Sequence, residues 1–268
     1  MRVVVAGLGV QGRKRQAIAG SDVVATVDPL GRDAHYRDIA DVPLDTYDAA
    51  LVCTPDEAKL SILRYLLGNG KHVLVEKPLL AEHAGAITEL ERLAAAGRAV
   101  CYTAYNHRFE PHFVRMKETI ESGALGRIYL CRMFYGNGTA RDVRRFENRA
   151  FDHMTFGAPG PPVLEMEATL VSWRNHFTAD VYGEKGSAHI SSLCKWGPSS
   201  FTRRARVLPS GRPPEEVTTL VQPDPTWQLE YDHFTMLCRK GEGGNLAHDL
   251  VLNRILNTLA AAALRPAP

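Results

Sequence analysis

A glycine-rich segment near the first residue constrains the fold more than any other feature of this chain. It reads Gly7-Leu8-Gly9-Val10-Gln11-Gly12 and lies between a β-branched run, Arg2–Ala6, and a helical pattern, Gly12–Ala19. Gly7 permits a tight turn, Gly9 permits close approach of the backbone to a pyrophosphate, and Gly12 permits close packing of helix on strand. Alone, the segment also fits an ordinary glycine-rich turn. Its place between strand and helix favours dinucleotide binding.

Apolar runs alternate with helical patterns over the first hundred residues. Strands that are apolar on both faces and separated by helices are typical of parallel sheets covered on both sides. The expected strands are Arg2–Ala6, Val23–Val27, Ala49–Cys53, His72–Val75 and Ala99–Thr103, and the expected helices are Gly12–Ala19, Glu57–Leu67 and Glu82–Ala96. This pattern predicts an α/β fold that begins with a doubly wound Rossmann domain over residues 1–108.

The pattern changes after Phe109, where longer alternating strands predominate. The expected strands are Arg127–Tyr135, Asp152–Phe156, Val163–Trp173, His176–Tyr182, Ser187–Ser192, Phe201–Leu208 and Val217–Val221. Helices are expected at Pro111–Ser122, Trp227–Arg239 and Asn245–Ala263, and a hairpin turn at 183–186. The pattern predicts a carboxy-terminal α+β domain over residues 109–268, with a large, mostly antiparallel open sheet and helices on one face.

Composition argues against several classes of function. The 268 residues carry a net charge of +2, which favours neither nucleic acid nor an anionic membrane surface as a partner. No apolar run approaches the roughly 20 residues of a membrane-spanning helix. The cysteines are odd in number and lack the spacing of a metal site, so we expect reduced thiols, a cytoplasmic location and no metal. They are Cys53, Cys101, Cys131, Cys194 and Cys238.

Two further segments stand at the ends of expected strands, where ligands bind in such sheets. Asp28 follows the second strand; a carboxylate there accepts the ribose hydroxyls of an adenosine and repels a 2′-phosphate, although it also suits a turn before Pro29. We therefore expect NAD as the cofactor. The nearby Arg32 leaves NADP as the alternative. Glu76-Lys77-Pro78 follows the fourth strand, where Lys77 could hydrogen-bond a substrate hydroxyl or merely be an exposed helix-cap lysine.

Taken together, the motifs resemble the glucose–fructose oxidoreductase and inositol dehydrogenase family (Gfo/Idh/MocA). The resemblance rests on the glycine-rich turn, Cys53-Thr54-Pro55-Asp56, Gly70–Pro78, Tyr105-Asn106-His107-Arg108-Phe109 and the strand pattern of Thr169–Ile190, and it spans nearly the whole chain. It implies NAD(P)-dependent oxidoreduction of sugars or cyclitols by a homodimer or homotetramer. It also implies that Cys53, Thr54, Pro55, Glu76, Lys77 and Asn106 join Asp28 and the glycine-rich turn in binding cofactor, and that Lys77 is catalytic.

The sequence departs from the family at one motif. A helix of the form D-x-G-x-H-x-x-D, whose histidine completes the family's site, has no counterpart between Tyr135 and Asn148. Either the helix is deleted, or the chain is interrupted between about Arg141 and Phe146, which we favour because deletion would uncover the sheet. His153, His176 and His189 lie on expected strands and fit sheet positions better than a catalytic one.

These observations leave two classes of function. The leading one is an oxidoreductase that transfers a hydride between a nicotinamide and a secondary alcohol or ketone of a sugar, sugar nucleotide or cyclitol. The alternative is a non-catalytic dinucleotide-binding sensor or regulatory protein that lacks the second catalytic motif. A ligand could be contacted by His107, Arg108, Trp173, Arg174, His176 and Trp196, and Arg174 with Arg203-Arg204 hints at an anionic substrate, though each also suits a solvated strand.

Overall fold

The chain folds into two compact units. The computed structural model describes residues 1–31, 33–81, 83–138, 153–241 and 243–263. Unit 1 comprises Met1–Asn106 and Trp227–Pro268, and unit 2 comprises His107–Thr226. The first boundary therefore lies two residues before the one expected at 108. Residues 227–268, which the sequence pattern assigned to the second domain, belong to unit 1 instead.

Unit 1 is a doubly wound parallel sheet. Its described strands are β1 (Val3–Ala6), β2 (Val23–Val27), β3 (Ala49–Val52), β4 (His72–Glu76) and β5 (Cys101–Ala104). They pair in the order β2-β1-β3-β4-β5, all in parallel, so that every strand ends at the same edge of the sheet. Because β1 and β3 are buried along their whole length, their sequences are apolar rather than alternating.

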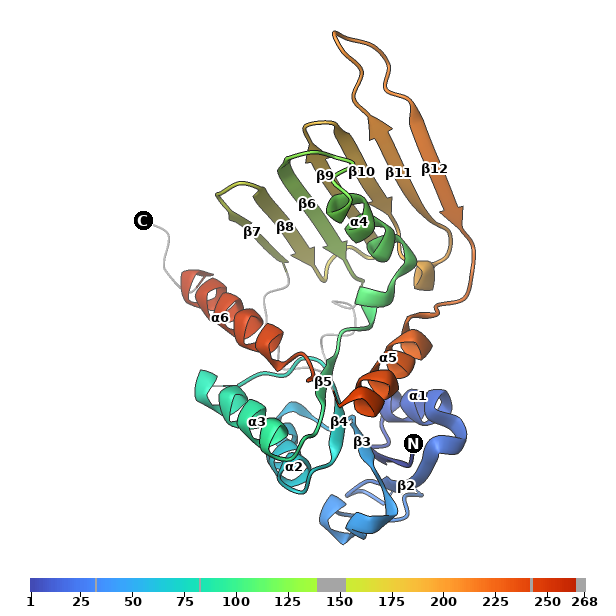
Figure 1. Cartoon of the computed structure of the whole chain (residues 1–268), viewed down its shortest axis with the longest axis vertical. Coiled ribbons are helices and arrows are strands. Elements are labelled where there is room, and N and C mark those ends of the chain that lie inside the picture. The colour runs from blue at the N-terminus through green and yellow to red at the C-terminus, as the bar shows by residue number, and fades with distance from the viewer. Residues whose placement is uncertain (32, 82, 139–152, 242, 264–268) are drawn as a thin grey trace. The chain divides into compact units, whose positions relative to one another are not determined.

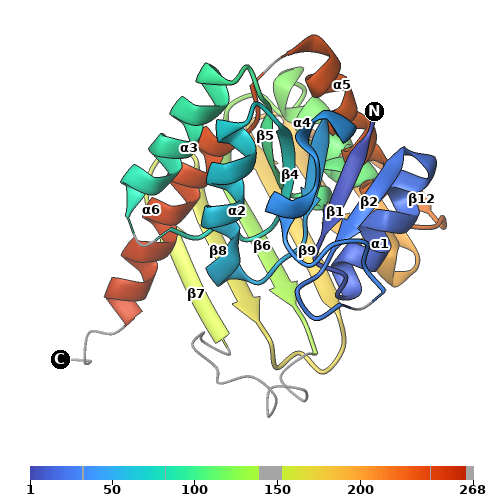
Figure 2. The same cartoon turned by 90° about the horizontal axis from the view of Figure 1, so that it is seen from below.

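Helices cover both faces of this sheet (Figures 1 and 2). They are α1 (Val10–Ala19), α2 (Asp56–Gly68), α3 (Ala84–Ala96), α5 (Thr226–Lys240) and α6 (Leu246–Ala263). One core contains residues of α2, α3 and α6, and the opposite core contains residues of α1 and α5. The carboxy-terminal residues join unit 1 because Tyr231, Phe234 and Leu237 of α5 bury their side chains against Val3 and Val5.

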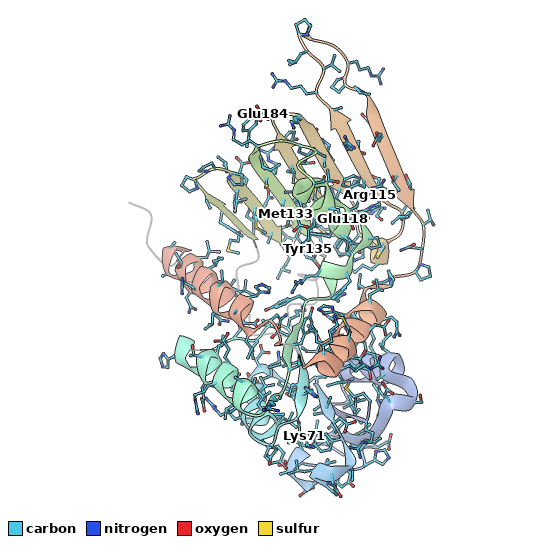
Figure 3. The ribbon with its side chains drawn as sticks, viewed as in Figure 1. Lys71, Arg115, Glu118, Met133, Tyr135 and Glu184 are labelled. Carbon is cyan, nitrogen blue, oxygen red and sulfur yellow. The ribbon has the colours of Figure 1, made fainter. Side chains whose placement is uncertain are left out.

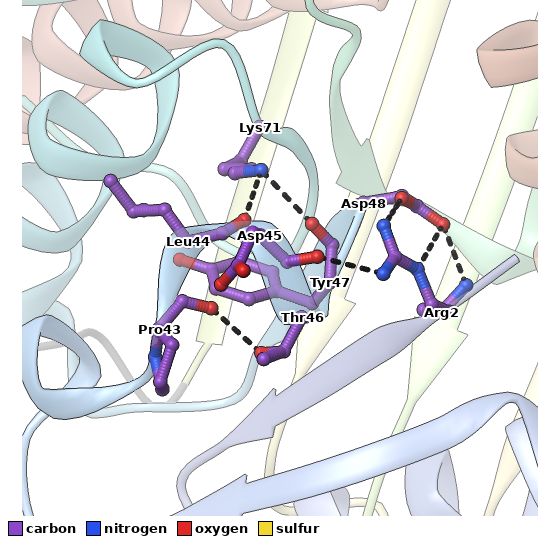
Figure 4. Close-up of polar contacts among 8 residues, drawn as sticks. All are labelled: Arg2, Pro43, Leu44, Asp45, Thr46, Tyr47, Asp48 and Lys71. Carbon is purple, nitrogen blue, oxygen red and sulfur yellow. Dashed lines mark hydrogen bonds and ion pairs between the residues drawn. The ribbon is translucent and has the colours of Figure 1, made fainter.

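Polar contacts fasten the loop that leads into β3 (Figure 4). Arg2 binds Asp48 through a 2.6 Å ion pair and donates to the Asp45 carbonyl at 2.7 Å. Lys71, just before β4, donates to the carbonyls of Leu44 and Tyr47. These bonds satisfy backbone oxygens in a stretch with only short 3₁₀ turns, at Ile39–Asp41 and Leu44–Thr46, as expected for an irregular segment.

Unit 2 is a mixed sheet with one described helix on one face. The strands are β6 (Ile128–Gly136), β7 (His153–Ala158), β8 (Val163–Thr169), β9 (His176–Gly183), β10 (Gly186–Ser191), β11 (Ser199–Ala205) and β12 (Glu215–Leu220). Their order is β12-β11-β10-β9-β6-β8-β7, and β6 with β8 is the parallel pair among the described strands. The mostly antiparallel second sheet and the hairpin at 183–186 are therefore confirmed.

Helix α4 (Pro111–Glu121) covers part of that sheet. Met116 packs with Phe177, Val181 and Ile190 in the core of unit 2. Met133 and Tyr135 of β6 are partly buried against this core, whereas Arg115 and Glu118 of α4 are exposed (Figure 3). The helices expected on this face at 227–239 and 245–263 form, but in unit 1.

Candidate cofactor and active site

The glycine-rich turn connects β1 to α1 in a conformation that excludes side chains. Gly7 has φ +91°, and a Cβ built on it would lie 2.7 Å from the carbonyl oxygen of Cys53. A Cβ on Gly12 would overlap the carbonyl oxygen of Gly7. Gly9 caps α1 without a side-chain hydrogen bond, so the first N–H groups of this helix remain available to an anion such as a pyrophosphate.

Asp28 lies at the end of β2 and holds the turn in place. Its buried carboxylate accepts hydrogen bonds from the backbone N–H groups of Leu8, at 2.8 Å, and Leu30, at 2.9 Å. An ionised carboxylate has about four acceptor positions, so it retains capacity for hydroxyl donors. The residue thus serves as a turn residue, the simpler of the two expectations, and keeps the acceptor character that a ribose requires.

The end of β3 places Cys53 and Thr54 against the same turn. Burial raises the pKa of the Cys53 thiol to about 12, so this thiol is unreactive at neutral pH. The hydroxyl oxygen of Thr54 is buried and has no hydrogen-bond partner within the described part of the chain. A buried hydroxyl without a partner is costly, and a bound cofactor would supply one. With the two glycine positions, this fits a dinucleotide.

Glu76 and Lys77 end β4 in contrasting environments. Glu76 is buried and forms a 2.7 Å ion pair with Arg15 of α1, whereas Lys77 is exposed. The following residues are tied down from two helices: Lys59 of α2 donates to the Pro78 carbonyl at 2.7 Å, and Asn253 of α6 donates to the Leu79 carbonyl at 2.9 Å. An exposed amine on a rigid turn at the ligand edge of the sheet can meet a substrate oxygen.

The end of β5 is fixed by α6. Thr103 and Tyr105 donate hydroxyl hydrogen bonds to opposite oxygens of Asp249, at 2.8 and 2.5 Å. Burial raises the pKa of Tyr105, so its hydroxyl stays protonated. Asn106 follows directly and begins the 3₁₀ turn Asn106–Phe109.

The expected substrate residues belong to unit 2 and fall into two groups. His107 lies 2.8 Å from the ammonium of Lys195, and its ring is 6.3 Å from that of Tyr135. The Tyr135 ring in turn packs at a tilt against Trp196. Trp173, Arg174 and His176 lie at the start of β9 and just before it; Trp173 is 68% exposed, and the ring of His176 packs on Phe134 at 5.1 Å. His153, His176 and His189 are on strands, as expected.

Sequence reasoning missed Arg15, Lys59, Glu230 and Asn253, which hold the site residues. One signal was available for Arg15. Gly12, Arg15 and Ala19 recur at helical spacing and are the buried residues of α1, so Arg15 occupies an inward position. The other three come from segments whose sequence spacing to the site carries no information. The expected interruption at Arg141–Phe146 lies outside the described residues.

Among the described residues, no group of three metal-ligating side chains converges, and no helix combines the length and apolarity required to cross a bilayer. All five cysteines are free thiols.

Comparison with known proteins identifies the amino-terminal part. Residues 1–105 match the family model described as "Oxidoreductase family, NAD-binding Rossmann fold" (GFO_IDH_MocA). The resemblance inferred from the motifs is thereby confirmed, as are the α/β fold and an NAD-binding Rossmann domain.

Relatives of known name match about half of the chain. Inositol 2-dehydrogenase 4 of Saccharopolyspora erythraea is 27% identical over 157 residues, which is 52% of this chain and 46% of the relative. Inositol 2-dehydrogenase 1 of the same organism is 33% identical over 141 residues, 52% of this chain and 39% of the relative. The match thus spans less than half of each relative's length.

Solved structures share the fold over nearly the whole chain. Levoglucosan dehydrogenase in complex with NADH and L-sorbose superposes with a TM-score of 0.82 at 16% identity, covering 98% of this chain and 96% of that one. An inositol dehydrogenase homolog complexed with NAD⁺ from Azotobacter vinelandii gives 0.70 at 16% identity, covering 90% and 87%. At such identity the likeness establishes the fold of both units.

Proposed function

We propose that this protein is an NAD-dependent oxidoreductase that transfers a hydride between the nicotinamide and a secondary alcohol or ketone of a sugar, sugar nucleotide or cyclitol. The observation that carries the proposal is the turn after β4. There an exposed Lys77 follows a buried, ion-paired Glu76, at the edge of the sheet where the glycine-rich turn, Asp28 and Thr54 also lie. The names of the relatives support a polyol substrate.

We assign the binding roles as the family resemblance implies them. The pyrophosphate takes the N–H groups at the start of α1, Asp28 accepts from the adenosine ribose, and Thr54 with Pro55 lies toward the nicotinamide ribose. Asp28 favours NAD over NADP because a 2′-phosphate beside its carboxylate is repelled. Glu76 and Asn106 complete the nicotinamide side.

The chemistry assigned to this chain is a proton transfer. Bound NAD supplies the hydride acceptor. Lys77 Nζ hydrogen-bonds the reacting oxygen of the substrate and orients it; as the neutral amine it takes the hydroxyl proton while the carbonyl forms, and as the ammonium it returns that proton in the reverse direction. The hydrogen bonds to the carbonyls of Pro78 and Leu79 keep the turn that carries Lys77 rigid.

Substrate contacts are proposed for unit 2. His107, Arg108, Trp173, Arg174 and His176 offer cationic and aromatic groups that suit a hydroxylated, ring-shaped ligand. We also propose that the protein acts as a homodimer or homotetramer in the cytoplasm. Its free cysteines agree with a reducing compartment.

Turnover tests the proposal directly. The full chain is incubated with NAD and, separately, with myo-inositol, levoglucosan and D-sorbitol. NADH formation is followed by absorbance, and NADH binding is followed by fluorescence. We expect NADH formation with at least one polyol. The sensor alternative, which the lack of a D-x-G-x-H-x-x-D sequence favours, predicts tight NADH binding and no turnover in a panel of polyols.

A further inference from the structure

One buried guanidinium connects three segments of unit 1. Arg15 of α1 is 1% exposed and binds two carboxylates, Glu76 at the end of β4 at 2.7 Å and Glu230 of α5 at 2.6 Å. Glu230, which is fully buried, also accepts a hydrogen bond from the backbone N–H of Tyr105. The Cζ atom of Arg15 lies 4.3 Å from the centre of the Trp227 ring, so this ring packs against the guanidinium.

Two of these segments, and the end of β5 beside Glu230, carry residues of the candidate site. Helix α1 begins at the glycine-rich turn, β4 ends at Glu76 and Lys77, and Tyr105 precedes Asn106. Arg15 therefore joins the element proposed to bind pyrophosphate directly to the end of β4 and, through Glu230, to the end of β5. Because a guanidinium is a planar fork with fixed donor directions, it sets the orientation of both carboxylates at once.

The cluster is an expensive way to stabilise a fold. Three ionisable groups lose their hydration on burial, and apolar side chains of similar volume often stabilise a protein as well or better. Nη1 of Arg15 and Oε1 of Glu230 are buried without a hydrogen-bond partner among the described residues, so the charges are incompletely compensated. Ionisable groups in such environments cluster at functional sites. The cluster therefore points to a role in orienting the site residues rather than in stabilising the fold.

We propose that Arg15 is a positioning residue, which fixes the carboxylate of Glu76 at the end of β4 and holds the pyrophosphate and nicotinamide sides of the cofactor site in register. The inference rests on the proposed function for the role of Glu76. Loss of the guanidinium frees Glu76 to turn away from its position, so the cofactor site loses its arrangement even where the unit stays folded.

Three variants separate positioning from stability. Arg15→Met removes the guanidinium and leaves two buried carboxylates. Arg15→Met combined with Glu230→Gln also neutralises the fully buried acid, while an amide oxygen remains for Tyr105. Lys14→Met is the matched control, because Lys14 is the neighbouring residue on α1, is exposed, and contacts the same Trp227 ring at 3.7 Å.

The readouts are the melting temperature, the Kd of NADH by fluorescence below each melting temperature, and kcat and KM where a polyol is turned over. We expect Arg15→Met to lower the melting temperature and to raise the Kd of NADH about tenfold. The double variant should recover most of the melting temperature but not the affinity, and its kcat should stay about 10- to 100-fold low. Lys14→Met should match the wild type.

A merely structural Arg15 gives a different pattern. Affinity for NADH would then return together with the melting temperature in the double variant, or stay within twofold of the wild type in Arg15→Met, and either result overturns the inference. The binding measurement needs no turnover, so a wild type that binds NADH without oxidising polyols refutes the proposed enzyme and still decides the role of Arg15. A wild type that fails to bind NADH overturns both.

Discussion

The carboxylate of Asp28 accepts a 2.8 Å hydrogen bond from the backbone N–H of Leu8, 20 residues earlier in the chain. This bond fixes the end of β2 against the turn between β1 and α1. The acid thus has a structural task in the free protein as well as the proposed one toward the ribose. A substitution at Asp28 must keep an acceptor if its effect on cofactor choice is to be separated from its effect on the turn.

Asp28→Asn keeps one acceptor. Its amide oxygen can still accept from Leu8, whereas the hydrogen bond from Leu30 is lost and the negative charge that repels a 2′-phosphate is gone. We expect the wild type to bind NADH more tightly than NADPH, and Asp28→Asn to bind NADPH about tenfold more tightly than the wild type does. Fluorescence titration gives both dissociation constants. Tighter binding of NADPH than NADH by the wild type would refute the assigned preference.

Gly12→Ala tests the turn itself. The added methyl group would overlap the Gly7 carbonyl, so the turn must open, at a cost of about 1–3 kcal/mol in the free energy of unfolding. We expect a lower melting temperature and weak NADH binding. Gly85→Ala is the control: it lies in α3, nothing is within 4 Å of its added Cβ, and it should be neutral or stabilising by up to about 1 kcal/mol. Equal behaviour of the two variants would contradict the described turn.

The buried acid Glu230 makes stability depend on pH. Burial raises its pKa to about 7, against the opposing effect of Arg15, so the folded state holds a proton that the unfolded state has lost above about pH 4.5. The extra stability is complete below pH 4.5 and is lost as the pH rises toward 7, on the order of 3 kcal/mol in all. Glu230→Gln should lack this slope. Thermal unfolding of both proteins between pH 5 and 8 measures it, and parallel profiles would contradict the shift.

The sequence predicted the parts of the site that depend on local pattern. Gly7, Asp28, Thr54 and Glu76 each follow an apolar run, and parallel strands end at one edge of a sheet, so their gathering follows from the strand assignment alone. The helices at 226–240 and 246–263 were also expected from their spacing. Their amphipathic patterns show that a face is buried but not which sheet buries it, and both pack in unit 1.

The residues that hold the site could not be predicted in the same way. Arg15 and Glu230 are 215 positions apart, and their ion pair arises from the packing of α1 and α5 on the same face of the sheet. Charged side chains are rarely buried, and whether one is buried depends on tertiary packing. A sequence pattern can therefore show only that a charged residue occupies an inward position, as the spacing of Arg15 does.

The role of Lys77 is the central claim, and turnover by Lys77→Ala tests it most directly. If Lys77 moves the substrate proton, kcat falls by about 10² to 10⁴ while the Kd of NADH and the melting temperature change little. Lys77→Arg should not restore kcat, because a guanidinium stays protonated and has a different shape. The measurement is kcat with the polyol that the wild type oxidises, alongside the melting temperature of each variant. A well-folded Lys77→Ala protein with near-normal kcat would contradict the account and leave Lys77 as a residue that only orders its turn.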